Sequence, residues 1–476
     1  MTVGHVNVKD TIERIQKEIS KDKSISPVLI SSIELLIVVI QMLFDRQSMN
    51  SSNSSLSPST DNKRRSRGKD KKKRRKKGEN SIGGQEGHAG STLTQYEEVD
   101  EVIEIPIDRR TLPVGEKFTK DVPETRQVID LNIDFVVREY QAEVLIGAAG
   151  MRFVAPFPEH ITKAIQYGPS VKSFAVYMSQ YQLIPYARVQ EVFKDQFDLN
   201  ISQGSLCNFN REAFDKLECF EADLIKKLRN EKVLNADETG IKIDTELAWA
   251  HVLCTPKFTF IYPHQKRGKD AMIEMDIIPN YSGVLVHDHW KPYLGYDCEH
   301  GLCNAHHLRE LQWVIDFKQH KWATSIKKFL TKLNVEVDDH GGVLPEDIQR
   351  RRIKRYRELV ISGNPECPTI VPALGSGKKK EKQTKERNLL NRLRDYEDQV
   401  LLFMKNKDVP FTNNQAERDI RMIKVQQKVS GQFKSMKSAR YFCRIRSYLM
   451  TAKKTGNSPF DKLNHLFFPE EQNYAE

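Results

Sequence analysis

Residues 231–243 read EKVLNADETGIKI, and they begin the part of the chain that decides the fold. Two more strand patterns follow at 246–255 (ELAWAHVLCT) and 258–265 (FTFIYPHQ). A helical pattern then occupies 267–278, and 282–290 (SGVLVHDHW) has the pattern of a fourth strand. Antiparallel strands that continue through a crossover helix into a further strand predict a mixed α/β sheet.

Three acidic residues in and beyond this region are candidates for catalysis. Asp237 closes the apolar run VLNA and Asp288 closes the run GVLVH, so we expect both side chains to project from strand ends of one sheet. Glu417 lies much later, in the helical stretch TNNQAERDIRMIKV that follows an insertion. Two divalent metals about 3.5–4 Å apart can drive phosphodiester transfer when several carboxylates hold them. The joint arrangement therefore predicts a metal-dependent enzyme that acts on DNA.

Each of these residues also has a purely structural interpretation. An aspartate in DETG is a common turn former, and Asp288 could simply end a strand. Asn414 and Glu417 have the spacing of a capping box, in which the glutamate only starts its helix. Taken singly, the structural interpretations are the more common ones, and the combination of all three residues favours catalysis.

Several sequence blocks resemble the transposases of the insertion sequence 66 family. They are NADETG, VHDHWKPY, CNAHH and FTNNQAERDIRMIKVQQKVSGQF, the last of which is highly specific. The subgroup it resembles also carries NSSNSS and a GGQxGHxG segment in its N-terminal arm, and GGQEGHAG stands here at residues 83–90. The resemblance runs from about Asn50 to Thr455 and covers most of the chain.

The resemblance implies a ribonuclease-H-like catalytic fold with a DDE triad, which falls on Asp237, Asp288 and Glu417. It also implies two Mg²⁺ ions, with Mn²⁺ as a possible substitute, and by analogy Asp237 bridges both. The implied reaction is cleavage of insertion-sequence ends, followed by strand transfer of the 3′-hydroxyl into target DNA. Implied partners are DNA, further copies of the chain and element-encoded accessory proteins. The implied location is the cytoplasm of a prokaryotic cell, in association with the nucleoid.

Two other functions stay open beside transposition. One is a nuclease of the same fold that cuts DNA without joining it. The other is a non-enzymatic DNA-binding protein derived from a transposase, which binds ends or represses.

The length of 476 residues exceeds what a single core usually organises, so we expect several units. The predicted units are an N-terminal helical segment (1–47), a disordered basic arm (48–93), a small β domain (94–155), a helical helix-turn-helix-like segment (156–230), a catalytic core (231–307 and 406–455), a helical insertion (308–405) and a C-terminal tail (456–476).

The small β domain is predicted from the alternation of apolar and polar residues. The apolar positions that alternate are Ile103, Ile105 and Ile107, and then Ile129, Leu131, Ile133 and Phe135. This period of two predicts half-buried strands.

The helix-turn-helix-like segment is predicted from two helical patterns on either side of a short turn. A helix is expected from about Tyr186 to Phe197, and Ser202 can cap a second helix. The second helix carries its apolar residues at helical spacing, at Leu206, Phe209, Ala213 and Leu217. Such a pair can read a major groove, although a plain packing unit is the more common outcome.

The formal net charge of +11 comes from one place. Residues 63–77, KRRSRGKDKKKRRKK, hold twelve lysines or arginines against one aspartate, so the rest of the chain is formally neutral. We expect this tract to contact DNA phosphates, although a solvated run or a localisation signal would look the same. The residues expected to bind DNA there are Lys63, Arg64, Arg65, Arg67, Lys71, Lys72, Lys73, Arg74 and Arg75.

The Glu417 helix carries a second group of cations, which comprises Arg418, Arg421, Lys424 and Lys428. A solvated face is the usual explanation of such charge. Beside a catalytic glutamate, we expect these residues to contact the DNA backbone. Further cations follow at Lys434, Lys437, Arg440, Arg444 and Arg446.

Cys303 and His306 match the Cys-x-x-His motif of the family, and we expect them to have a structural role near the site. A zinc site is an alternative, because Cys298 and His307 lie close by, but no second cysteine pair completes a four-ligand set. Many family members carry paired CxxC motifs after the arm, whereas residues 92–171 contain no cysteine. Zinc is therefore not expected.

Residues 28–44, VLISSIELLIVVIQMLF, are the most apolar part of the chain. They are at the short limit for a membrane span and are interrupted by polar residues. Leu29, Leu36 and Leu43, with Ile33 and Ile40, form a helical stripe that favours packing against a partner helix. Seven cysteines without the spacing of a disulfide scaffold fit a reducing compartment.

Overall fold

The computed structural model describes residues 2–3, 6–21, 26–50, 52–54, 95–371 (without 120, 132 and 135) and 381–468. Most of the predicted basic arm falls on residues 55–94, which lie outside the described residues. The nine arm cations from Lys63 to Arg75 belong to that part. DNA contact by the arm therefore stays a prediction.

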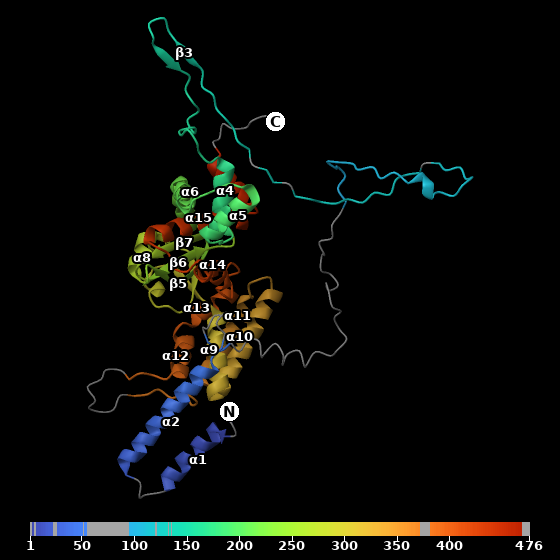
Figure 1. The fold of residues 1–476 in the computed structure, drawn as a ribbon. Helices are drawn as coiled ribbons and strands as arrows, with labels where there is room; N and C mark the ends of the chain where they lie inside the picture. The colour runs from blue at the N-terminus through green and yellow to red at the C-terminus, as the bar shows by residue number, and fades with distance from the viewer. Residues whose placement is uncertain are drawn as a thin grey trace.

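A five-stranded mixed sheet forms the centre of the chain's largest unit (Figure 1). Its strands are β5 (Val233–Ile243), β6 (Glu246–Cys254), β7 (Thr259–His264), β8 (Val284–His287) and β9 (Glu299–Leu302). The order is β7-β6-β5-β8-β9, with β6 antiparallel to β5 and β7 and with β8 parallel to β5 and β9. The predicted mixed α/β sheet is confirmed, including the crossover through α8 (Lys269–Met275).

Helices cover both faces of this sheet. On one face, α14 (Asn414–Ser430) and α15 (Met436–Lys454) bury residues such as Ile241 and Val252. On the other face, α7 (Glu218–Arg229) and α8 bury residues such as Leu234 and Leu253. Because side chains alternate along a strand, odd-numbered residues of β5 face α14 and even-numbered ones face α7 and α8.

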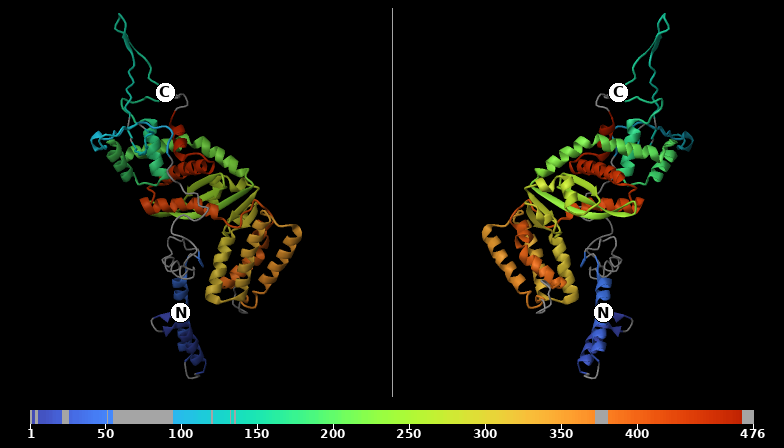
Figure 2. Two further views of the ribbon diagram at one scale, coloured as in Figure 1. Left: turned by 90° about the vertical axis from the view of Figure 1, so that its right-hand side faces the viewer. Right: turned by 90° about the vertical axis from the view of Figure 1, so that its left-hand side faces the viewer.

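The predicted helical insertion is a helical bundle beside the sheet, coloured yellow to orange in Figure 2. Its helices are α9 (Asn304–Lys318), α10 (Lys321–Asp339), α11 (Glu346–Ile361), α12 (Lys385–Asp395), α13 (Glu397–Leu401) and the 3-10 turn η5 (Leu402–Met404). They share one apolar core, which also includes Val284 and Val286 of β8.

The two ends of the insertion meet at a narrow neck. The Asn304 amide donates to the Phe411 carbonyl at 3.1 Å, and the Asn413 amide donates to the Cys303 sulfur at 3.1 Å. The bundle is therefore joined to the sheet where the chain enters it and where the chain leaves it.

The helix-turn-helix-like pair is present as α5 (Tyr186–Phe197) and α6 (Gln203–Lys216). Ser202 caps α6, because its hydroxyl accepts a hydrogen bond from the Ser205 amide at 3.0 Å. The predicted apolar residues Leu206, Phe209, Ala213 and Leu217 are all buried. They pack in one core with α4 (Pro169–Val176), the π-helical turn η2 (Tyr177–Tyr181) and part of α15. The helices are confirmed, and DNA reading by α6 stays a prediction.

The expectation of a C-terminal tail is wrong for residues 459–467. They form the helix α16 (Pro459–Phe467), which packs against α4. Leu463 and Phe467 are buried in the same core as the helix-turn-helix-like pair. The burial of these two side chains accounts for the helix.

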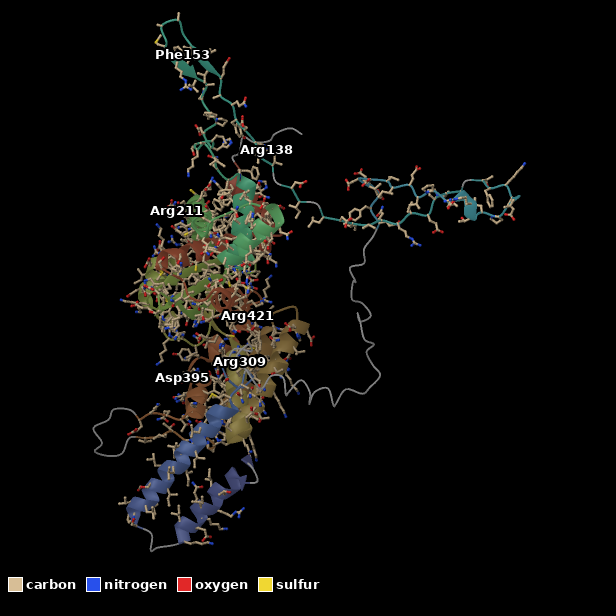
Figure 3. The ribbon with its side chains drawn as sticks, in the orientation of Figure 1. Arg138, Phe153, Arg211, Arg309, Asp395 and Arg421 are labelled. Carbon is tan, nitrogen blue, oxygen red and sulfur yellow. The ribbon has the colours of Figure 1, made fainter. Side chains whose placement is uncertain are left out.

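The expectation of half-buried strands in the small β domain is also wrong for the described residues. Ile103, Ile105 and Ile107 are 76%, 90% and 72% exposed and are not in a strand, and Ile129, Leu131 and Ile133 are likewise exposed. Phe135 lies outside the described residues. A single hairpin, β3 (Val144–Ile146) with β4 (Arg152–Val154), projects far from the sheet, with Phe153 in its second strand (Figure 3). Alternation favours a strand, but no second layer covers these apolar side chains.

The N-terminal segment contains the hairpin β1 (Thr2–Val3) and β2 (Val6–Asn7), followed by α1 (Val8–Lys21) and α2 (Pro27–Ser48). The side chains of Leu29, Leu36 and Leu43 on α2 are 53%, 60% and 61% exposed. Among the helices that the structure describes, none is both long and apolar enough to cross a membrane.

Candidate active site

Asp237 and Asp288 lie at the same level of two adjacent parallel strands. The register pairs Asn235 of β5 with Val286 of β8, and each aspartate comes two residues later in its chain. Asp288 directly follows β8, as expected. Asp237 differs from the expectation of a strand end, because β5 continues to Ile243 through its pairing with β6. The aspartate nevertheless stands where the parallel partner strand ends.

Glu417 lies in the first turn of α14, on the face of the sheet toward which Asp237 points. The side chain of Asn413 fixes the start of this helix. Its Nδ2 donates a hydrogen bond to the Ala236 carbonyl at 2.7 Å, and its Oδ1 accepts one from the Asn235 side chain at 2.9 Å. The capping-box interpretation does not hold, since Asn413 precedes the helix and makes no side-chain cap. Glu417 contacts Arg309 instead, at 3.0 Å.

The acidic neighbours of Asp237 affect its ionisation. The pKa of Asp237 is raised well above its usual range, first by burial and then by the neighbouring Glu238, with further contributions from Asp288 and Glu417. Within the described part of the chain, neither Asp237 nor Asp288 has a lysine or arginine within 4.0 Å. This oxygen-rich and negatively charged set suits a hard divalent cation.

Cys303 and His306 lie beside Glu417, and their structural role near the site stays a prediction. The three side chains offer ligand atoms within 4.8 Å of one another, a group that could hold a metal ion. Burial raises the pKa of the Cys303 thiol. Burial and the Arg309 charge lower the pKa of His306.

Glu238 is a further acidic residue with defined side-chain partners, and its sequence pattern did not predict them. Its carboxylate is 1% exposed, pairs with Arg267 and accepts a hydrogen bond from the Tyr293 hydroxyl at 2.7 Å. The Arg267 guanidinium lies between the rings of Trp249 and Trp290, at 4.8 and 4.4 Å from their centroids. Arg267, Tyr293 and the two tryptophans form a clamp around Glu238. The clamp holds the Glu238 side chain away from the face of the sheet on which Asp237 meets α14. In the sequence, Glu238 is marked only by standing next to Asp237, and the residues that clamp it come from three other segments of the chain.

A buried histidine beside this clamp makes the stability of the protein dependent on pH. Burial lowers the pKa of His251 in β6 from 6.5 to about 4. The unfolded chain takes up this proton near pH 6.5, so the stabilisation is complete above that pH and is lost as the pH falls toward 4. We expect a loss of about 3 kcal/mol from this group, and a His251→Leu variant should lack it. Urea unfolding across the pH range measures both proteins, and parallel curves would contradict the assignment.

The cations of α14 have different surroundings. All four side chains are exposed, and Lys424 also donates to the Gly240 carbonyl of β5. Arg418 also donates to Gln415 of its own helix at 2.8 Å. Arg421 is labelled in Figure 3. Three of these four side chains are therefore available to a phosphate backbone.

Three of the basic side chains that follow in α15 make ion pairs or hydrogen bonds with other parts of the protein. Arg440 pairs with Glu274, Arg444 pairs with Glu221, and the Arg446 guanidinium donates to backbone carbonyls of η2. Arg446 is almost fully buried. The charge pattern of α15 is therefore largely explained by packing.

The comparison with protein families agrees with this arrangement. A model of the family described as Transposase IS66 family matches residues 164–441, more than half of the chain. The chain belongs to this transposase family. The matched range of the IS66 transposase includes all three candidate carboxylates together with Cys303 and His306. A second model, of a family of unknown function (DUF6444), matches residues 7–94. No curated protein matches the chain.

Proposed function

We propose that this IS66-family transposase cleaves the ends of its insertion sequence and transfers the freed 3′-hydroxyl into target DNA. Asp237, Asp288 and Glu417 are the proposed DDE catalytic residues. The observation that carries the proposal is their convergence from β5, the end of β8 and the first turn of α14. The charge of this group, unmatched by a cation at either aspartate among the described residues, supports a role in metal binding.

The order of the strands supports a ribonuclease-H-like core. Three antiparallel strands continue into two parallel ones, helices cover both faces, and the insertion separates β9 from the Glu417 helix. Because β5 and β8 are adjacent and parallel, their acidic residues share one edge of the core. This is the arrangement that the proposed DDE chemistry needs.

We propose that the three carboxylates hold two Mg²⁺ ions, for which Mn²⁺ can substitute. When bound, divalent ions would neutralise charge on the phosphodiester and help to deprotonate the attacking group. The chain itself positions the ligands, since Arg309 holds Glu417 and Asn413 anchors the helix start on β5. Cys303 has a positioning role in this proposal, because its sulfur accepts a hydrogen bond from the backbone amide of Asn413.

We also propose that DNA phosphates lie along the exposed face of α14. Arg418, Arg421 and Lys428 provide charge on the helix that carries Glu417. Contacts of this type orient the duplex without reading its sequence. Lys424 would contribute less, because burial lowers its pKa and its ammonium group already donates to Gly240.

A strand-transfer assay distinguishes the proposal from the two alternatives. Labelled DNA that carries the element ends is incubated with the full chain, a target plasmid and Mg²⁺. We expect a product in which the labelled 3′ ends are covalently joined to the plasmid. Release of 3′ ends without joining would favour the nuclease, and binding without any cleavage would favour the non-enzymatic DNA-binding protein.

We further propose that copies of the chain associate through α2. Leu36 and Leu43 expose apolar surface on this helix, which an identical helix can cover. The double change Leu36→Asp and Leu43→Asp should therefore lower the oligomeric state in analytical ultracentrifugation. A matched change on another exposed face, Lys332→Asp on α10, should not. An unchanged sedimentation profile of the leucine variant would contradict the proposal.

A further inference from the structure

A cleft of about 770 Å³ lies between the helical insertion and the loop that follows β8. One wall comes from α9 and α12, and a second comes from His289 and Lys291, which follow Asp288 directly. Met49 and Asn53, just after α2, close a third side. Asp395, labelled in Figure 3, marks the end of α12 at this cleft.

The cleft adjoins the candidate active site. His289 is the neighbour of Asp288, and Arg392 of α12 is near enough for the Asp288 charge to raise its pKa, against the larger lowering by burial. Arg392 also pairs with Glu310 across the cleft wall. A ligand in the cleft would therefore lie next to a phosphodiester held at the carboxylates.

Several polar atoms of the lining residues are buried and, within the described structure, have no hydrogen-bond partner. They are His289 Nδ1, Trp313 Nε1, Asn391 Oδ1 and Arg392 Nε. Buried polar atoms are satisfied in nearly all proteins, so a cluster of exceptions around one cavity points to a polar ligand. Donors and an acceptor both occur, which suits a ligand with both kinds of group.

The lining combines aromatic rings with cations. Trp313 and Tyr396 provide rings, and the Tyr396 ring contacts His289 with the centroids 4.4 Å apart. Lys291, Lys385 and Arg392 provide the positive charge, against Glu310 and Asp395. Aromatic faces for bases and cations for the backbone are the means by which proteins bind single-stranded nucleic acid. The volume is that of a small-ligand pocket and excludes a duplex.

We propose that this cleft binds an unpaired nucleotide of the DNA strand that is cut at the three carboxylates. The base stacks in the cleft with Tyr396, and the adjoining phosphate meets Arg392. The inference rests on the proposed function, because it places the cut strand at Asp288. It assigns to the helical insertion a direct part in holding substrate.

A binding experiment without metal tests the cleft separately from the chemistry. The full chain is titrated, in EDTA, with a fully paired duplex and with the same duplex carrying a short unpaired end. The unpaired end contains 2-aminopurine, whose fluorescence reports stacking. We expect wild type to bind the forked DNA about tenfold more tightly than the paired DNA, which is within the contribution of one stacked base.

Variants identify the residues responsible. Tyr396→Ala and Arg392→Gln should reduce the preference for forked DNA to within about twofold, while their affinity for paired DNA and their melting temperatures show that they are folded. Tyr396→Phe should keep the preference, because it keeps the ring. Arg351→Gln, the same charge change at an exposed position of α11, should also keep it.

Either of two results would overturn the inference: equal binding of both DNAs by wild type, or an unchanged preference in Tyr396→Ala. Asp237→Asn separates this inference from the proposed function. The variant should keep the preference for forked DNA in EDTA and lose cleavage in Mg²⁺. Cleavage at the wild-type rate by Asp237→Asn would refute the catalytic assignment while leaving the cleft result intact.

Discussion

Replacing Asp237 by asparagine should reduce DNA cleavage and joining by about a thousandfold or more, which corresponds to several kcal/mol of lost transition-state stabilisation. The change keeps the size of the side chain and removes one charge from the centre of the three carboxylates. Because Asp237 is partly buried beside Asp288 and Glu417, another acidic group cannot easily take its place. Single-turnover rates with end-labelled DNA and saturating Mg²⁺ give the measurement.

The matched control is Asp244→Asn, at the other end of the same strand region. Asp244 lies in the turn between β5 and β6, is exposed and has a positive φ of 47°, which asparagine tolerates well. This variant should cleave and join at nearly the wild-type rate. If the two variants had similar rates, whether both fast or both slow, the special role of Asp237 would be refuted.

Replacing Lys454 by methionine should lower the free energy of unfolding by about 3–5 kcal/mol. The Lys454 ammonium pairs with Asp419 of α14, and both side chains are largely buried, at 13% and 5% exposure. Without the lysine, the Asp419 carboxylate would keep its hydrogen bonds from Thr259 and Gln415 but have no cation. Denaturant unfolding at neutral pH measures the loss.

Lys453→Met provides the matched control, since its side chain is exposed at the adjacent position of α15. It should change the free energy of unfolding by less than about 0.5 kcal/mol. The double variant Asp419→Asn with Lys454→Met should recover part of the lost stability, because no unpaired charge remains. Equal losses in the two lysine variants would show that the pair does not stabilise the fold.

The central sheet could be predicted because each of its strands has a local sequence pattern typical of a strand. Residues 233–236 and 284–287 are short, mostly apolar runs, each followed by an aspartate, and the parallel pairing of β5 with β8 brings the two aspartates together. Glu417 could be placed only through its sequence block and the resemblance. The clamp on Glu238 could not be predicted, because Arg267, Tyr293 and two tryptophans approach it through tertiary packing.

The wrong expectations also have physical reasons. Alternation around Ile105 shows that a strand is possible, but it does not show whether a second layer covers the apolar side. The partners of the α15 cations were equally hidden in the sequence, because Arg444 meets Glu221 and Arg446 meets the carbonyls of η2 only in the folded chain. The residues after Thr455 were too few to indicate a helix without α4 as its partner.

The neck of the insertion limits how a change in the helical bundle affects the candidate site. Cys303 and Asn304 are hydrogen-bonded to Asn413 and Phe411, so the chain returns beside the point from which it left the sheet. The helices α10 and α11 can therefore change in length without moving Glu417 relative to Asp237, as long as α9 keeps Arg309 beside Glu417. The neck thereby separates the length of the outer helices from the geometry of the three candidate carboxylates.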